Sequence, residues 1–374
     1  MTHVLIIGGG AAGIFAALGA RHTAREHHLS DENFKVVLLE RNPRPGIKIR
    51  ISGGGKCNIT HDGDISDILQ KGFLRKNEQR FLKHALYALT NKTVMKWLHQ
   101  HGVKTLTREN GRVFPESGLA TDVLSAFEDM LDESKITLLK NERALKVDQK
   151  EGLFSVQTTA QLIQAPTLIL ATGGVSYSKT GTTGDGLSFA QALGHTIVPV
   201  SSALAPIFFQ EPPDPELVGV SLRSVRLTVK SGARIASRRG DVLISHRGLT
   251  GPACLSLSRD AADMLFKKPG PDHREKASVF IDFFPEQDTE TLQEMIVSHA
   301  GQNGNQTIRK FLQTCPIAPP SGSISKASQL ETIPTAVVPF IMAQAKLDYE
   351  QKWHNLSKAS RQVLVSTLKH FWIG

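Results

Sequence analysis

Cysteine is scarce in this 374-residue chain. Only Cys57, Cys254 and Cys315 occur, and they lie far apart, with no C-x-x-C or C-x4-C pair. This spacing excludes a disulfide framework, indicates neither a zinc site nor any other metal centre, and argues against a redox-active dithiol. We therefore expect three separate thiols in a protein of a reducing compartment.

Long hydrophobic runs are also missing. The apolar N-terminus lacks a basic leader, and glycine interrupts it after four residues, so it does not have the pattern of a signal peptide. No later run approaches the roughly 20 residues of a membrane span. We expect a cytoplasmic protein without a membrane partner. The 44 Lys and Arg against 35 Asp and Glu give a formal charge of +9, which suits anionic ligands and leaves nucleic acid open as a partner.

The first twenty residues carry the strongest pattern. Val4 to Ile7 form a continuous apolar run, as in a strand buried on both faces. Gly8, Gly10 and Gly13 then give G-x-G-x-x-G, and an Ala-rich helix follows to residue 20. In this context Gly8 permits a tight turn, Gly10 lets the backbone approach a pyrophosphate, and Gly13 lets the helix pack closely on the strand. The pattern predicts a dinucleotide-binding unit.

The next segment extends the predicted site. Residues 34–40 read as a second strand that ends at Glu40, where such folds place a carboxylate for the adenosine ribose. A glycine-rich loop follows, and its backbone amides and cations suit a phosphate or an anionic ring system. The glycines are Gly53, Gly54 and Gly55, and the cations are Lys48, Arg50 and Lys56.

The rest of the chain predicts a mixed architecture. We expect helices within 61–105 and over 119–131 and 187–193, a compact turn at 111–115, and strands at 136–139, 144–147, 153–158 and 167–171. From residue 197 onward short β-like pieces follow, then a strand at 279–284 and helical stretches over 286–367 with a Pro/Ser/Gly-rich connection at 316–328. Residues 179–186 contain no Walker motif, and Asp185 reads as a helix cap or an acceptor of hydroxyl and N–H groups.

Several segments together resemble the YhiN/BaiN-like flavoproteins, a family of FAD-dependent oxidoreductases. The matching segments are Gly8–Gly13, 47–58 (IKIRISGGGKCN), 111–115 (GRVFP), 171–174 (ATGG), 180–186 (TGTTGDG) and 246–252 (HRGLTGP). The resemblance implies an α/β fold: a Rossmann-like FAD-binding domain with an inserted β-barrel-like domain and a helical domain. The expected boundaries are 1–190, 191–285 and 286–367, with 368–374 as the start of a truncated return strand.

The resemblance also implies which residues contact FAD. It places the pyrophosphate at the first glycine turn, the ribose at Glu40, the flavin along the 48–58 loop and the adenine at backbone groups of Ala144. The expected cofactor-binding residues are Gly8, Gly10, Ala11, Ala12, Gly13, Glu40, Arg41, Lys48, Ser52, Gly53, Gly54, Gly55, Lys56, Cys57, Asn58, Ala144, Thr172, Gly173, Gly174 and Asp185. Cys57 and His246 are the candidates for a catalytic role, His246 because its unperturbed pKa suits proton transfer near neutrality.

One departure from the family pattern stands out. The family ends in a glycine-rich segment that returns to the FAD domain, and nothing after Leu364 matches it. Two explanations for the missing segment remain open: the chain is truncated, or a second chain completes the site.

Three functions therefore remain open. The leading hypothesis is hydride transfer between FAD and an unidentified small-molecule substrate, with NADH or NADPH implied only by the family. The second is a nucleic-acid-associated flavoprotein of the transfer-RNA-modifying kind, suggested by the charge and by Arg223, Arg226, Arg234, Arg238, Arg239, Arg247, Lys267 and Lys268. Nucleic acid is not the expected partner, because no aromatic residues alternate with these cations. The third is a non-catalytic remnant.

Overall fold

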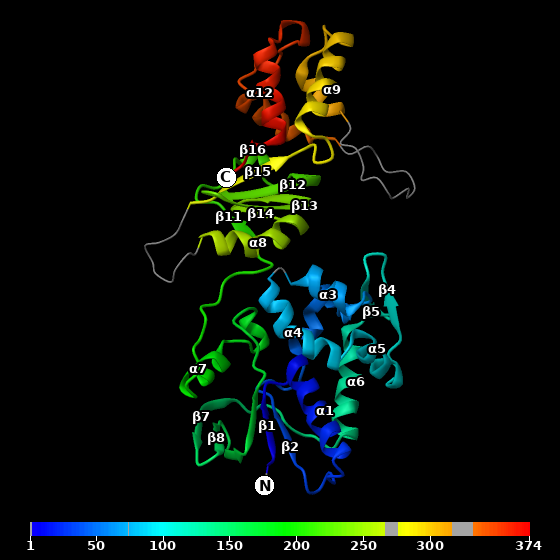
Figure 1. The fold of residues 1–374 in the computed structure, drawn as a ribbon, viewed down its shortest axis with the longest axis vertical. Helices are drawn as coiled ribbons and strands as arrows, with labels where there is room; N and C mark the ends of the chain where they lie inside the picture. The colour runs from blue at the N-terminus through cyan, green and yellow to red at the C-terminus, as the bar shows by residue number, and fades with distance from the viewer. Residues whose placement is uncertain (1, 74, 266–275, 316–331) are drawn as a thin grey trace. The chain divides into compact units, whose positions relative to one another are not determined.

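The computed structural model describes residues 2–73, 75–265, 276–315 and 332–374. The chain forms two compact units, Met1–Val198 (unit 1) and Pro199–Gly374 (unit 2), labelled by element in Figure 1. The predicted boundary lay at 190, a few residues earlier. Each unit is described by itself below.

Unit 1 is built on a four-stranded parallel sheet in the order β10-β1-β2-β6. Strand β1 (Val4–Ile7) lies in the centre and pairs with β2 (Val36–Leu39) on one side and β10 (Thr167–Leu170) on the other. Strand β6 (Thr137–Leu139) continues the sheet beyond β2. The predicted strands at 34–40, 136–139 and 167–171 are therefore present, and all three lie in the sheet of the first glycine turn.

Both faces of this sheet are covered, which explains the unbroken apolar run of β1. Val4 and Ile6 pack into a cluster with α1 (Ala11–Glu26) and α6 (Ala120–Glu133). Leu5 and Ile7 point the other way, into a second cluster with a three-stranded sheet and α7 (Asp185–Ala192). Alternating side chains thus meet different layers, and a strand buried on both faces has no polar side.

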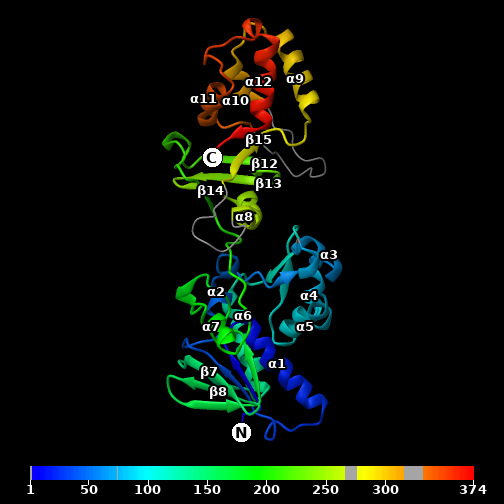
Figure 2. The ribbon, with the colours of Figure 1, turned by 60° about the vertical axis from the view of Figure 1, so that its left-hand side comes forward.

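The remaining elements of unit 1 surround this core (Figures 1 and 2). Two small antiparallel sheets have the orders β7-β8-β9 and β3-β5-β4. Their strands are β3 (Thr60–His61), β4 (Thr105–Thr107), β5 (Arg112–Pro115), β7 (Ala144–Lys150), β8 (Leu153–Thr158) and β9 (Leu162–Ala165). The further helices are α2 (Ile47–Ile51), α3 (Ile65–Gly72), α4 (Lys76–Ala88) and α5 (Asn91–Gln100).

Two local predictions differ from the structure. The segment 111–115 was predicted as a compact turn, but residues Arg112–Pro115 form strand β5, because Val113 and its neighbours pair on both sides with β3 and β4. The segment 47–51, expected within a loop, forms the short helix α2, and only residues 52–57 make the tight glycine turn that follows.

Unit 2 contains a six-stranded sheet and the remaining helices. The strand order is β11-β14-β13-β12-β15-β16. The strands are β11 (Ile207–Phe208), β12 (Ser221–Ser231), β13 (Arg234–Ser245), β14 (Gly248–Thr250), β15 (Ser278–Asp282) and β16 (Phe371–Trp372). The helices are α8 (Pro252–Leu265), α9 (Thr289–Gln302), α10 (Ile308–Thr314), α11 (Val338–Gln344) and α12 (Lys358–Lys369).

The sheet and helices of unit 2 share one hydrophobic core. Side chains from β12 and β15 join those from α8, α9, α11 and α12 in a single buried cluster. This shared core is why residues 286–367, expected as a separate helical domain, fall in the same compact unit as the strands. Among the described residues the sheet is open, with β11 and β16 at its edges, where a barrel-like domain was expected. The predicted connection at 316–328 lies outside the described residues.

The last strand has a partner in unit 2. Phe371 and Trp372 pair antiparallel with Ile281 and Phe280 of β15. The segment 368–374 was predicted to be the start of a truncated return strand, and within it Phe371 and Trp372 extend the sheet of unit 2. Separately, none of the described helices is long and apolar enough to cross a membrane.

Candidate functional site

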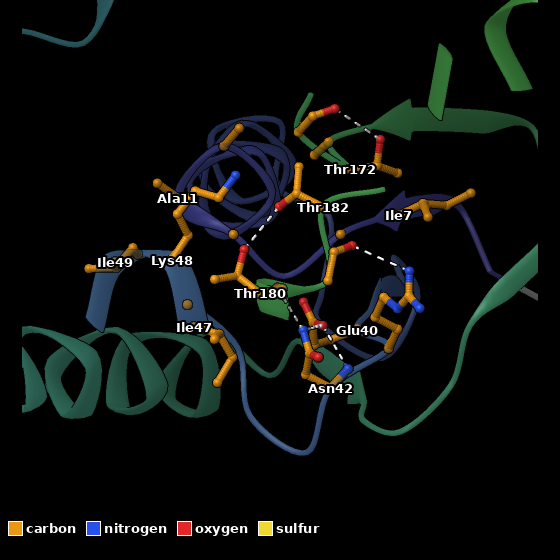
Figure 3. Close-up of a pocket in the computed structure, with 18 of the residues that line it drawn as sticks. Ile7, Ala11, Glu40, Asn42, Ile47, Lys48, Ile49, Thr172, Thr180 and Thr182 are labelled. Atoms are coloured by element: carbon orange, nitrogen blue, oxygen red, sulfur yellow. Dashed lines mark hydrogen bonds between the residues drawn. The ribbon is translucent and has the colours of Figure 1, made fainter. Parts of the chain in front are cut away.

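A cavity of about 700 Å³ opens in unit 1 at the carboxyl ends of β1 and β2 (Figure 3). Its lining includes Ile7 and the glycine turn from β1, Leu39 to Asn42 from β2, and Leu170 to Gly173 from β10. In open parallel sheets, ligands bind at this edge because the strand ends leave a crevice there. The sheet therefore positions the cavity, and the loops after its strands supply the polar lining.

The first glycine turn is shaped by close backbone approaches. Gly8 has a positive φ of 109°, and a Cβ there would lie 2.5 Å from the carbonyl oxygen of Ala171. A Cβ on Gly13 would collide with the carbonyl oxygen of Gly8. Gly10 differs, because a Cβ there would meet nothing within 4 Å. Close contacts within the protein explain why Gly8 and Gly13 must be glycine. No such contact requires glycine at Gly10, which faces the cavity.

Helix α1 begins at this turn with an uncompensated N-terminus. Gly10 is the N-cap and supplies no side chain, and no acidic residue lies in the first turn. The first N–H groups of a helix have no acceptor within the helix and carry partial positive charge. Ala11 and Ala12 line the cavity, so this end of α1 is suited to an anion.

Glu40 is buried at the end of β2, with 6% of its surface exposed. Its Oε2 accepts a hydrogen bond of 2.9 Å from the N–H of Gly9, and its Oε1 accepts two of 2.7 Å from Asn42. A carboxylate has about four acceptor positions, so one on Oε2 remains for a ligand. Figure 3 shows the Glu40 and Asn42 side chains together at the cavity wall.

A network of charged side chains borders another part of the cavity. Asp185, the first residue of α7, accepts hydrogen bonds from Arg143 at 2.9 Å and from Thr183 at 2.8 Å. Arg41 donates to Thr183 at 3.0 Å and lies 3.7 Å from Asp185. Burial raises the pKa of Asp185, but the Thr183 hydrogen bond and the two guanidinium groups outweigh it and hold this pKa below its ordinary value.

The segment after β2 brings Lys48, Ser52, Cys57 and Asn58 to the cavity. Lys48 donates a 2.9 Å hydrogen bond to the carbonyl of Ser176. Cys57 is buried, with 4% exposed. Burial raises the pKa of its thiol, and a hydrogen bond with Ser52 offsets only part of this effect. Cys57 therefore carries its proton at neutral pH.

An apolar lobe completes the cavity. Phe15 from α1 contacts Phe127 from α6 edge-on, with 5.4 Å between ring centroids. Ile59, Val94 and Val123 line the same cavity. A cavity with an apolar lobe and a few convergent polar groups is typical of a small-molecule or cofactor site.

The structure brings most of the predicted cofactor residues together. Those that line the cavity are Gly8, Gly10, Ala11, Ala12, Glu40, Arg41, Lys48, Ser52, Cys57, Asn58, Ala144, Thr172, Gly173 and Asp185. Those that do not are Gly13, Gly53, Gly54, Gly55, Lys56 and Gly174. Gly13 acts through helix–strand packing. Gly53, Gly54 and Gly55, all at positive φ, shape the turn that carries Cys57. His246 lies exposed in the turn between β13 and β14 of unit 2.

Sequence reasoning missed Asn42, Arg143 and the Thr180–Thr183 loop as lining residues. Asn42 lies two residues after Glu40, and Arg143 lies directly before Ala144. Their closeness in sequence to these predicted contacts was the signal that could have identified them as lining residues. The Thr180–Thr183 loop lies within the segment TGTTGDG, in which Asp185 was the predicted contact.

The cavity fits FAD. The open space over Gly10, the bare N-terminus of α1 and the spare acceptor on Glu40 provide for a pyrophosphate and a ribose, and the apolar lobe provides for a ring system. In the described residues, no group of three or more His, Cys, Asp or Glu side chains is placed to hold a metal ion.

Comparisons with known proteins identify the family of the chain. The family model described as "HI0933-like protein Rossmann domain" matches residues 2–325. A ribosomal RNA dihydrouridine synthase from Escherichia coli is 28% identical over 334 residues, 88% of this chain and 74% of that protein. A 3-dehydro-bile acid delta(4,6)-reductase from Clostridium scindens is 27% identical over 314 residues, 83% of this chain and 72% of that protein.

Among solved structures, L-proline dehydrogenase from P. horikoshii is similar over 62% of each chain, with 11% identity and a TM-score of 0.34. The family match covers most of the chain. The chain therefore belongs to the HI0933-like family of Rossmann-fold, FAD-dependent oxidoreductases, the YhiN/BaiN-like flavoproteins that its motifs resemble.

Proposed function

We propose that FAD lies in the unit 1 cavity with its pyrophosphate over Gly10 and the first turn of α1. The observation that carries this proposal is the open space over Gly10, which no packing requirement explains. Glu40 then accepts from the adenosine ribose through its spare position on Oε2, and backbone groups of Ala144 contact the adenine. The Arg143–Asp185 pair borders the cavity at α7 and stabilises the loop that holds the adenosine end.

The 48–58 segment serves the flavin end of the site in this proposal. FAD, when bound, supplies hydride transfer at its isoalloxazine ring. Lys48 and the backbone amides near Asn58 favour negative charge on that ring, and Phe15, Val94 and Phe127 exclude water from its surroundings. The protein itself therefore binds FAD, stabilises negative charge on its ring and supplies the proton for the reaction.

We further propose that the reaction is reduction of a carbon–carbon double bond conjugated to a carbonyl group. The names of the two relatives describe chemistry of this one kind. Uridine becomes dihydrouridine by saturation of a ring double bond conjugated to a carbonyl, and a delta(4,6)-reductase acts on double bonds in a 3-oxo steroid. Such a reduction adds a hydride to one carbon and a proton to the carbon next to the carbonyl.

Cys57 is the proposed source of that proton. Its thiol lines the cavity and holds its proton at neutral pH, since burial raises its pKa. As the hydride adds, the electron pair of the double bond moves toward the carbonyl. The Cys57 Sγ proton then goes to the carbon beside the carbonyl, and water reprotonates the thiolate.

Replacing Cys57 by Ser is expected to lower turnover about 100-fold, the usual contribution of a positioned acid, while FAD content stays unchanged. The hydroxyl keeps the size and polarity of the side chain but is a much poorer acid. Activity of the unmodified protein should stay level through neutral pH and fall as the pH rises through the raised pKa of Cys57. Steady-state rates from pH 6 to 10 check this. Equal rates for both forms across this range would remove Cys57 from the mechanism.

The reaction class is tested with the purified protein loaded with FAD. The flavin is reduced anaerobically with NADPH or NADH, and uridine, cyclohexenone and a 3-oxo-4-ene steroid are added separately. We expect at least one conjugated substrate to restore the oxidised flavin spectrum and to gain two hydrogens by mass spectrometry. Reoxidation by none of them, with activity on a saturated amine or alcohol instead, would contradict this proposal.

A further inference from the structure

Asn42 lies two residues after Glu40 and connects two parts of the wall of the unit 1 cavity. Its backbone N–H and its Nδ2 each donate a hydrogen bond of 2.7 Å to Oε1 of Glu40. The same Nδ2 donates at 3.2 Å to the backbone carbonyl of Thr180. Figure 3 shows Asn42 and Glu40 beside Thr180, and all three residues line the cavity. Asn42 therefore holds the end of β2 and the Thr180–Thr183 loop at one point.

These contacts require an amide side chain at position 42. Nδ2 has two hydrogens, and the carboxylate of Glu40 and the carbonyl of Thr180 use both of them. The reverse orientation of the amide would set Oδ1 against two acceptors, so the network itself decides which atom is the nitrogen. Asp has the same shape as Asn but no side-chain hydrogen to donate when it is ionised.

The Thr180–Thr183 loop is shaped to receive this contact. Gly181 has a positive φ of 92°, and a Cβ there would lie 2.7 Å from Nδ2 of Asn42 and 3.2 Å from Cδ of Arg41. Glycine lets the loop approach this closely in that conformation. Arg41 adds a second attachment, because it donates to Thr183 at 3.0 Å. The loop is therefore attached to the end of β2 through residues 41 and 42.

The contacts of Asn42 also fix the direction of the Glu40 carboxylate. Rotation about the last torsion of a glutamate side chain is only loosely restricted, so a free carboxylate would present its acceptor positions in many directions. Here the N–H of Gly9 holds Oε2 at 2.9 Å, and Asn42 holds Oε1 twice. The contacts among the described residues leave one position on Oε2 for a ligand, and the direction of that position depends on Asn42.

We propose that Asn42 is a positioning residue that aims the Glu40 carboxylate at the adenosine ribose, so that the site selects FAD over FMN. This inference rests on the proposed placement of FAD in the unit 1 cavity. The two flavins share the isoalloxazine ring, the ribityl chain and one phosphate, and only FAD contains the adenosine that Glu40 receives. Holding an acceptor in its bound direction lowers the ordering cost of binding, and only a ligand that uses the acceptor gains from this.

The test compares binding of FAD and FMN by the flavin-free full chain, measured through quenching of flavin fluorescence. Asn42→Ala removes the side-chain donor but keeps the backbone N–H bond to Glu40, so we expect FAD affinity to fall about 10-fold. Asn42→Asp keeps the shape and sets a second carboxylate against Glu40, so a loss of about 30-fold is expected. FMN affinity should stay within about twofold in both variants. ADP, which contains the adenosine but no flavin, should lose affinity as FAD does in competition assays.

Asn91 provides a matched control for a purely structural role. It is a buried asparagine, 7% exposed, whose Nδ2 donates to the backbone carbonyls of His61 at 2.6 Å and Gly63 at 2.9 Å. Asn91 is not among the residues that line the cavity. Asn91→Ala should therefore lower the midpoint of urea unfolding at least as much as Asn42→Ala does, while the ratio of FAD to FMN affinity stays unchanged.

A double variant tests whether Asn42 acts through Glu40. Glu40→Ala removes the group that Asn42 orients, so the addition of Asn42→Ala should cost little further FAD affinity. Fully additive losses would overturn the inference. So would an equal loss of FAD and FMN affinity in Asn42→Ala, or the same change of the FAD-to-FMN ratio in Asn91→Ala.

Failure of this inference can be told apart from failure of the proposed function. If Glu40→Ala weakens FAD binding and Asn42→Ala does not, the ribose contact stands and the role of Asn42 is wrong. If neither variant weakens FAD binding, both the role of Asn42 and the proposed ribose contact are wrong. Asn42→Ala leaves the flavin end of the site untouched, so turnover at saturating FAD should be unchanged, and a fall in that turnover would also overturn the inference.

Discussion

Replacing Gly10 by Asp is expected to abolish FAD binding while leaving the fold intact. A Cβ at Gly10 meets nothing within 4 Å, and the backbone there has φ −81° and ψ −174°, which other residues adopt freely. Asp is also a favoured N-cap, so α1 should be as stable as before or more stable. The new carboxylate would occupy the place proposed for the pyrophosphate, and two like charges about 4 Å apart repel by several kcal/mol even in a partly solvated site.

We therefore predict a loss of FAD affinity of about 100-fold or more, measured by quenching of flavin fluorescence, with an unchanged melting temperature. Gly10→Asn is the matched control, because it has nearly the same shape without the charge and should lose less affinity than Gly10→Asp. Binding by Gly10→Asp within threefold of the unmodified protein would place the pyrophosphate elsewhere.

Two glycines of the same helix should respond to alanine in opposite directions. At Gly13 a Cβ would collide with the carbonyl oxygen of Gly8, so α1 must move away from β1. Overpacking of this kind costs about 1–3 kcal/mol and sometimes more, and the displaced turn should also weaken FAD binding. At Gly19 the same change meets open space in an exposed helical position, so it should stabilise the protein by about 1 kcal/mol.

Urea unfolding of Gly13→Ala and Gly19→Ala, side by side, checks this prediction. Opposite shifts of the midpoint are expected, with FAD affinity changed only in Gly13→Ala. Equal stability of the two variants would mean that the contact between Gly13 and Gly8 does not limit the packing of α1 on β1.

The sequence predicted the structure best at positions where a single physical requirement restricts the residue type. The apolar run of β1, the three glycines and the terminal Glu40 each follow from burial, close approach or ligand geometry, so the central sheet and the anion-binding turn could be predicted. The cavity walls made by Phe15, Val94 and Phe127 could not, because an apolar residue on an amphipathic helix has the same pattern whether it faces a core or a cavity.

The roles of the charged residues could not be predicted from the sequence, for a different reason. In the sequence, the arginines of β12 and β13 suggested a nucleic-acid surface together with Lys267 and Lys268, two lysines that lie outside the described residues. Asp241, Asp260 and Glu286 pair with arginines that are distant along the chain or across the sheet, and such pairing depends on the fold. The same holds for Asp185, whose role as partner of Arg143 appears only when α7 lies beside β7.

The central claim is that the unit 1 cavity holds FAD, and a crystal structure of the protein with FAD tests it most directly. The account predicts electron density for the pyrophosphate over Gly10 and the N-terminus of α1, with the adenosine ribose on Glu40 and the isoalloxazine ring beside Cys57 and Asn58. FAD bound at any other place, or bound in this cavity with its pyrophosphate away from Gly10, would contradict it.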